Sequence, residues 1–540
     1  MTGSIKIAFW IAVLALAVLR PKLGDEAWQR VEEAGRRVAR RPVAGWLGLG
    51  LLVLLVRAAL LPLWAIPEPV IYDEFGYLLQ ADTFASGRLT NPPHAVLQFF
   101  ESVYILHQPT YNAKYPPGQG LALALGQAVL GDPWFGVWLS CGAMMAALCW
   151  ALQGWLPQRW ALLGGLLALP LCLFSYWMDS YWGGAVAAVG GALVMGAYAR
   201  ILRGRSAYAW LLGLGLVLLA MTRMYEGALF SAPFAAAVVV RTRRLRVWAP
   251  IALVLVAGAS FLLHYNAVVT GHALRLPYAE YQRQYGYVPL FHFQALSPAK
   301  IYHNQSVADV FFGWEYRQWK RSQTWTLWLD RGQAWGRVLA LLAQVWPLML
   351  LFAALVWTAF RDRRMRLPLF GLGAVCAGSL LQITYYAHYA APAMAALLLV
   401  LVQCLRHLRQ IGIRGTGVGR SLGRAVPAGM LLLVCFDQGA RLYRQEAIEQ
   451  TQPANARRGR MERKLVEERP DRKHLIVVRY TGTQDPHEEW VYNRADIDGS
   501  SVVWAHDLGA EQNRVLLDYF QERTVWLFQP DRDPDLLTPY

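Results

Sequence analysis

The sequence is poor in charged residues, in paired cysteines and in repeats. Asp, Glu, Lys and Arg make up 16% of its 540 residues, well below the roughly 25% of an ordinary soluble domain. This scarcity argues against a soluble, secreted or disordered protein. The six cysteines form no CxxC pair and lie in or beside apolar stretches, so neither structural disulfides nor a thiolate metal site is expected.

The sequence is instead rich in long apolar stretches, and 56% of its residues are hydrophobic. A cleavable signal peptide is not expected, because the first apolar run, residues 5–19, ends at Arg20 and Pro21 without a small-residue cleavage site. Stretches of about 17–25 apolar residues mark transmembrane helices. The pattern predicts twelve such helices, centred near Leu14, Leu54, Met144, Leu167, Gly191, Leu214, Ala235, Val254, Met349, Ala374, Ala395 and Leu432.

The formal net charge of +16 raises the question of a nucleic-acid partner. The basic residues, however, gather in short segments between the apolar stretches. By the positive-inside rule these Arg-rich segments face the cytoplasm. The charge is therefore a topology signal, and no nucleic-acid partner is expected. The Arg-rich segments are 20–42, 200–205, 241–246, 361–366 and 406–424.

This orientation puts the other polar segments on the periplasmic face. They are residues 67–133, the turn 176–184, residues 264–336 and a tail from about residue 438. Fourteen aromatic residues lie between Tyr278 and Trp328, and their faces suit either a headgroup belt or contact with sugar rings.

The tail predicts a small α/β domain outside the membrane. Its strand-like runs are 474–480, 501–506 and 525–528, its helical stretch is 511–520, and a polar linker at 445–463 precedes them. The predicted units are residues 1–42, a transmembrane helix with a basic amphipathic segment; residues 43–440, the transmembrane module; and residues 441–540, the C-terminal domain.

Two adjacent carboxylates, Asp73 and Glu74, begin the first outer segment. The apolar spacing of the residues that follow predicts an amphipathic helix that stops near Gly87. Carboxylates held at the membrane surface suit a general base or a cation site. Alternatively, Asp73 is a helix N-cap and Glu74 a first-turn acid.

The same segment ends in a basic and aromatic stretch before a proline pair. His107, Lys114 and Tyr115 precede Pro116 and Pro117, which fix an extended turn. Lys114 is then a cation near the headgroup level, where it either holds a phosphate or snorkels.

Together these motifs resemble the first outer loop of GT-C glycosyltransferases, closest to the protein O-mannosyltransferase and lipid A aminoarabinose transferase branch. In order and topology the resemblance spans roughly residues 47–392. The resemblance implies an all-α polytopic membrane fold with about 12 transmembrane helices, periplasmic loop helices and the C-terminal α/β domain. It also implies a polyprenyl-phosphate sugar donor and transfer with inversion to an acceptor hydroxyl on a protein, lipid or glycan.

The resemblance assigns roles to residues. Asp73 matches the base, with Glu74 and Asp179 as further acids, and these three could hold a divalent cation such as Mg or Mn. Lys114 lies one place earlier than in the aminoarabinose branch, where the Lys directly precedes Pro-Pro. The residues predicted to contact acceptor or sugar are Tyr77, His107, Tyr115 and Tyr389.

Further cations are predicted at the same membrane level as Asp73. They are Arg223, His264 and His388, and with Lys114 they are expected to bind the donor phosphate, because ionisable groups at membrane depth tend to be functional. Arg223 could equally pair with Glu226, and His388 could be an interfacial residue of a tight turn.

The sequence thus predicts a glycosyltransferase in the bacterial inner membrane, surrounded by membrane lipids, with its active site on the periplasmic side. The alternative is a polytopic transporter or flippase of a lipid-linked or small substrate. A third reading is a membrane-anchored assembly protein that works through its tail.

Overall fold

The computed structural model describes residues 3–343, 356, 360–412, 417–443, 457–481 and 488–540. Eleven of the twelve predicted helix centres fall inside helices, and the twelfth, near Met349, lies outside the described residues. The bundle consists of α1 (Gly3–Leu19), α3 (Pro42–Ala59), α5 (Pro117–Leu130), α6 (Trp134–Gln153), α7 (Gln158–Leu167), α8 (Leu169–Phe174), α9 (Ala185–Ile201), α10 (Ala209–Thr222), α11 (Met224–Arg241), α12 (Leu245–Thr270), α16 (Thr326–Ala343), α18 (Arg366–Ser379), α19 (Met394–Gln410) and α20 (Val418–Tyr443).

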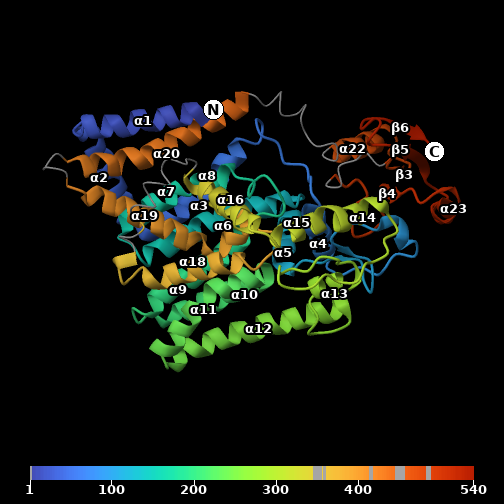
Figure 1. Cartoon of the computed structure of the whole chain (residues 1–540), viewed down its shortest axis with the longest axis horizontal. Coiled ribbons are helices and arrows are strands. Elements are labelled where there is room, and N and C mark those ends of the chain that lie inside the picture. The colour runs from blue at the N-terminus through green and yellow to red at the C-terminus, as the bar shows by residue number, and fades with distance from the viewer. Residues whose placement is uncertain (1–2, 344–355, 357–359, 413–416, 444–456, 482–487) are drawn as a thin grey trace.

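Five helical stretches among the described residues are long and apolar enough to cross a membrane. They are Pro42–Ala59, Trp134–Gln153, Leu245–Thr270, Ala387–Gln410 and Val418–Gly439. Four shorter apolar helices accompany them: Ser4–Leu19, Gln158–Phe174, Ala185–Ile201 and Ser206–Thr222. In Figure 1 the long helices run along the long axis of the molecule, which agrees with a multi-pass membrane protein.

An amphipathic helix, α2 (Asp25–Ala39), is tied to the bundle by ion pairs. Glu32 pairs with Arg409 of α19 at 2.9 Å and with Arg424 of α20 at 2.8 Å, and Arg424 also pairs with Asp25. Although burial acts to raise it, the two guanidinium groups lower the pKa of Glu32 to about 2.

The loop segments form a layer between the bundle and the C-terminal domain (Figure 1). The first contains α4 (Tyr72–Ala85), the predicted amphipathic helix, and a short hairpin of β1 (Ile105–Leu106) and β2 (Asn112–Ala113). The second contains α13 (Pro277–Gln284), α14 (Gln305–Ala308), the π-helix η3 (Asp309–Glu315) and α15 (Tyr316–Ser322).

The predicted α/β domain is present at the other end of the molecule. Its sheet has the order β4-β3-β5-β6, with β3 parallel to β4 and β5 and with β6 antiparallel to β5. The elements are β3 (His474–Val478), β4 (Val502–His506), α23 (Ala510–Tyr519), β5 (Thr524–Phe528) and β6 (Leu537–Pro539).

One boundary of this domain needs correction. The predicted linker 445–463 ends in helix α22 (Arg458–Glu468), whose Met461 and Leu465 pack with Ile476 and Trp504 of the sheet. The prediction of a linker was wrong here because α22 is polar on most of its surface and buries only one narrow apolar face. Residues 444–456 of the linker lie outside the described residues.

The C-terminal domain docks on the helix that carries Asp73. Asp82 Oδ2 of α4 accepts from the Ala495 amide at 2.8 Å, and the Phe75 and Tyr492 rings lie 4.6 Å apart. The Tyr111 hydroxyl donates to the Asn493 carbonyl at 3.0 Å. The domain therefore helps to fix the position of α4.

The ion pairs of α2 predict a pH-dependent stability. Replacing Glu32 by Gln should lower the Tm of the purified protein near neutral pH, measured by thermal unfolding in detergent. Because the folded pKa is depressed, the carboxylate stabilises above its ordinary pKa of 4.5, and this contribution is lost as the pH falls toward 2. The Tm difference should therefore shrink at acid pH. Glu33→Gln, the neighbouring exposed acid, is the control, and an equal effect of both variants would contradict the account.

Candidate active site

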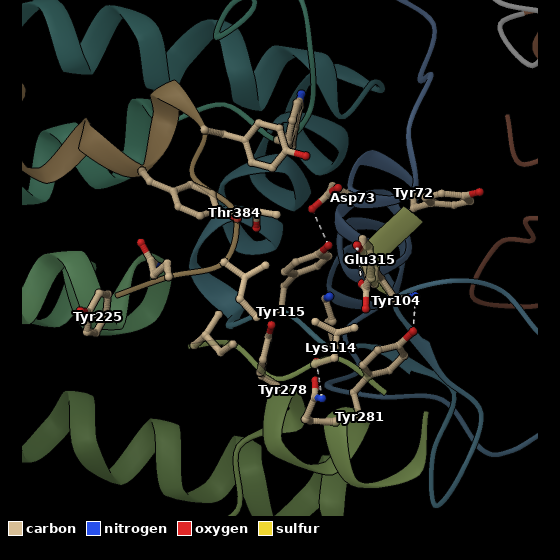
Figure 2. Close-up of a pocket in the computed structure, with 18 of the residues that line it drawn as sticks. Tyr72, Asp73, Tyr104, Lys114, Tyr115, Tyr225, Tyr278, Tyr281, Glu315 and Thr384 are labelled. Atoms are coloured by element: carbon tan, nitrogen blue, oxygen red, sulfur yellow. Dashed lines mark hydrogen bonds between the residues drawn. The ribbon is translucent and has the colours of Figure 1, made fainter. Parts of the chain in front are cut away.

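A cavity of about 620 Å³ lies among the loop segments at one end of the bundle (Figure 2). Its walls come from α4, from the turn before α5, from the junction of α10 and α11, from residues 276–318 and from residues 382–389. Asp73, Tyr77, Lys114, Tyr115, Arg223 and Tyr389 all line it, so six of the predicted site residues meet there.

The start of α4 aims Asp73 into this cavity. Glu74 Oε2 accepts from the backbone N–H groups of Val70 at 2.7 Å and Ile71 at 3.1 Å, which fixes the first turn. The N-cap is Ile71, so Asp73 is not the cap residue that the alternative reading proposed. Asp73 Oδ1 instead accepts a hydrogen bond from the Tyr115 hydroxyl at 2.6 Å.

Glu74 faces away from the cavity and joins two segments. Its Oε1 accepts from the Tyr181 amide at 3.1 Å, which ties α4 to the turn 176–184. Burial raises the pKa of Glu74 to about 7, while its backbone hydrogen bonds act in the opposite direction. Its position is that of a residue that holds Asp73 in place.

A glycine lets Tyr115 approach Asp73. A Cβ atom on Gly76 would lie 2.9 Å from Cε2 of the Tyr115 ring, closer than packed carbon atoms approach. The absence of that atom allows the ring to lie against α4, stacked on Tyr77 with 4.4 Å between ring centroids.

Lys114 lies in a cage of aromatic rings. Its Nζ is 3.1 Å from the centroid of Tyr104 and about 5 Å from those of Tyr278 and Tyr281. The Tyr104 hydroxyl donates to Glu315 Oε1 at 3.1 Å, and Figure 2 shows Glu315 beside this cage. Burial lowers the pKa of Lys114 to about 8, against the opposing effect of Glu315 and Asp73.

Arg223 occupies a break between two helices. Its backbone angles, φ −127° and ψ 75°, end α10 before α11 begins. The guanidinium lies over the Tyr389 ring at 4.2 Å. Among the described residues it forms no ion pair, and Glu226, its alternative partner, accepts from the Gln382 amide at 2.8 Å instead.

Close packing brings Lys114 and Arg223 to the same cavity. A Cβ atom on Gly118, which follows the proline pair, would lie 2.6 Å from Thr222 Cγ2 and 2.7 Å from the Met221 carbonyl oxygen. This contact sets the start of α5 directly against the end of α10.

Two predicted acids do not reach the cavity. Asp179 pairs with the buried Arg57 at 3.5 Å, and the Arg57 guanidinium also lies 4.7 Å from the Trp134 ring. Glu74 is bound to backbone amides, as described above. The predicted set of Asp73, Glu74 and Asp179 therefore does not converge on a divalent cation, and no cluster among the described residues suits a metal.

Three predicted histidines also lie elsewhere. His388 is buried, its Nδ1 within 2.9 Å of the Tyr176 hydroxyl. His107 Nε2 accepts from the Ser102 amide at 3.2 Å, and burial lowers the pKa of His107 to about 3. His264 is an exposed residue of α12. The sequence predicted that these histidines line the site, but none of them lines the cavity.

Several lining residues were not predicted individually. Tyr278, Tyr281 and Glu315 belong to the segment whose aromatic richness was noted, and Tyr104 belongs to the first outer segment, yet nothing in their spacing indicated that they meet at Lys114. The available signal was Glu315 itself, an acid within an aromatic run.

The fold and the cavity define a class: a polytopic helical chain with a C-terminal α/β domain, whose loop segments and helix ends line a cavity at one end of the bundle. No family model matches the sequence, and no curated protein matches it.

Two solved structures of ArnT from Cupriavidus metallidurans are similar to it. The apo structure gives a TM-score of 0.50 at 14% sequence identity, over 90% of this chain and 93% of that one. The structure bound to undecaprenyl phosphate gives 0.48 at 15% identity, over 91% of this chain and 90% of that one. The apo comparison confirms the predicted fold, a mostly helical membrane-protein fold like that of ArnT with a small C-terminal sheet.

The burial of Lys114 in the tyrosine cage predicts that its amine is more reactive than that of an ordinary lysine. Because its pKa is lowered, Lys114 should react faster than exposed lysines such as Lys320 with a small amine-directed reagent, when corrected for access. Glu315→Gln removes the charge that opposes this shift, so the reaction should become faster still. Pulse labelling with peptide mass spectrometry measures both rates.

Asp309→Asn is the matched control, since Asp309 is an exposed acid of the same segment that does not line the cavity. Slower labelling of Lys114 in Glu315→Gln would contradict the arrangement.

Proposed function

We propose that the protein is an inverting glycosyltransferase that moves a sugar from a polyprenyl-phosphate donor to an acceptor hydroxyl. The observation that carries the proposal is the meeting of one carboxylate, Asp73, with two cations, Lys114 and Arg223, in one cavity. The similarity of the fold to that of ArnT supports the proposal.

The two cations suit the donor phosphate. A buried ammonium and a guanidinium held in place by protein stabilise negative charge best where water is scarce. A small side cavity shares Lys114 and is lined by Met224, Leu262 of α12 and Leu276. We propose that the polyprenyl chain lies on this side of the site, along the apolar residues next to α12.

Asp73 suits the acceptor. The acceptor oxygen attacks the anomeric carbon as the bond from that carbon to the phosphate oxygen breaks, and the phosphate keeps the bonding electrons. Asp73 takes the acceptor proton and passes it to solvent. Glu74 and Asp179 support this step by fixing α4 and the turn 176–184, and no step requires a metal ion.

The orientation proposed for the chain follows from its arginines. Helices α9 and α11 begin beside the cavity and carry Arg200 and Arg241 in their last turns. Helix α19 begins near Tyr389 and carries Arg409 in its last turn. The cavity and the Arg-rich segments therefore lie at opposite helix ends. By the positive-inside rule, we place the cavity and the C-terminal domain on the periplasmic side of a bacterial inner membrane.

Replacing Asp73 by Asn is expected to lower transfer by about 100-fold or more, because a positioned base is lost. Lipid binding should remain. Lys114→Met is expected to weaken binding of undecaprenyl phosphate, because a cation at the phosphate is lost. Transfer from undecaprenyl-phosphate sugars, and mass spectrometry of copurifying lipid, measure the two effects.

Asp309→Asn is again the matched control and should behave as wild type. Full transfer by Asp73→Asn would refute the assignment of the base. Lipid binding by wild type with translocation and no transfer would favour the flippase alternative.

A further inference from the structure

The cavity has a second polar wall, away from Asp73. Figure 2 shows Tyr225 and Thr384 on the side opposite Asp73 and Glu315. Next to them in the chain, Glu226 and Gln382 also line the cavity, and the Gln382 amide donates to Glu226 Oε1 at 2.8 Å. This pair has no role in the transfer step described above.

The pair is rich in acceptors and short of donors. Gln382 is 3% exposed, and its Oε1 has no hydrogen-bond partner among the residues that the structure describes. Glu226 is 4% exposed. A buried amide oxygen without a partner is costly, and a buried carboxylate requires donors. The wall is therefore complementary to a ligand that donates hydrogen bonds.

The backbone that carries Gln382 is held from two sides. The Arg331 guanidinium of α16 donates to the carbonyl oxygens of Ser379 at 2.6 Å and Ile383 at 2.9 Å, and also to that of Gln382. On the other side Gln382 forms a β-bridge with Phe291. The backbone at Gln382 is thus fixed, as in a prearranged binding site.

We propose that Glu226 and Gln382 bind hydroxyl groups of the donor sugar. This inference rests on the proposed function and names the part of the site that recognises the carbohydrate. The carboxylate repels a phosphate, so the phosphate is left to Lys114 and Arg223. Arg223 lies three residues before Glu226, which puts the sugar wall next to the phosphate cations. The rings of Tyr225 and Tyr389 line the cavity there and suit a sugar face.

The test compares two ligand types on the full-length protein in detergent. One is bare undecaprenyl phosphate, and the other is a panel of undecaprenyl-phosphate hexosides and pentosides. Wild type should bind at least one glycoside more tightly than the bare lipid. Gln382→Met should weaken binding of that glycoside by about tenfold, the loss expected for one hydrogen bond, and should leave binding of the bare lipid unchanged. Glu226→Gln should weaken the glycoside too, and should not weaken the bare lipid.

Gln323→Met is the matched control. Its exposed amide donates to the His292 carbonyl, beside the β-bridge, but it does not line the cavity, so both ligands should bind as in wild type. Thermal unfolding checks that each variant is folded.

Each other outcome has a distinct meaning. If wild type binds no glycoside better than the bare lipid, or if Gln382→Met weakens both equally, the assignment of the sugar wall is overturned. If wild type fails to bind the bare lipid at all, the proposed function itself is contradicted.

Discussion

The Lys114 ammonium is held 3.1 Å from the centroid of the Tyr104 ring, within a cage of tyrosines and close to Asp73 and Glu315. A buried cation is stable only if charges and ring faces surround it, and here both come from segments far apart in the sequence. The cage therefore requires the first and second loop segments to meet at one point. The position of every other group in the cavity depends on that meeting.

Two glycines, Gly76 and Gly118, allow these segments to approach closely enough. Without a Cβ atom at Gly76, Tyr115 lies against α4 and donates to Asp73. Without one at Gly118, the start of α5 packs on the end of α10, so that Lys114 and Arg223 face one cavity. Glu74 then locks α4 to the turn 176–184 through the Tyr181 amide. The account assigns the chemistry to Asp73, Lys114 and Arg223, and the rigidity to their neighbours.

Much of this could be predicted from local patterns. Apolar length located the helices, and period and alternation located α4 and the C-terminal sheet, because each depends on residues close in sequence. The partners of a given side chain could not be predicted, since they depend on packing between distant segments. Asp179 was expected in the cavity but pairs with Arg57, and His388 was expected at a phosphate but contacts Tyr176. Conversely, Glu315 stands out in the sequence as an acid within an aromatic run, but its meeting with Lys114, about two hundred residues away, could not be predicted.

The central claim is that a polyprenyl phosphate lies between Lys114 and Arg223 with Asp73 facing the sugar carbon. A cryo-electron microscopy structure of the Asp73→Asn protein with bound undecaprenyl-phosphate sugar tests it most directly. The account predicts phosphate density within hydrogen-bond distance of Lys114 Nζ and the Arg223 guanidinium, with residue 73 on the opposite side of the anomeric carbon. Phosphate density away from both cations, or a sugar out of reach of residue 73, would contradict it.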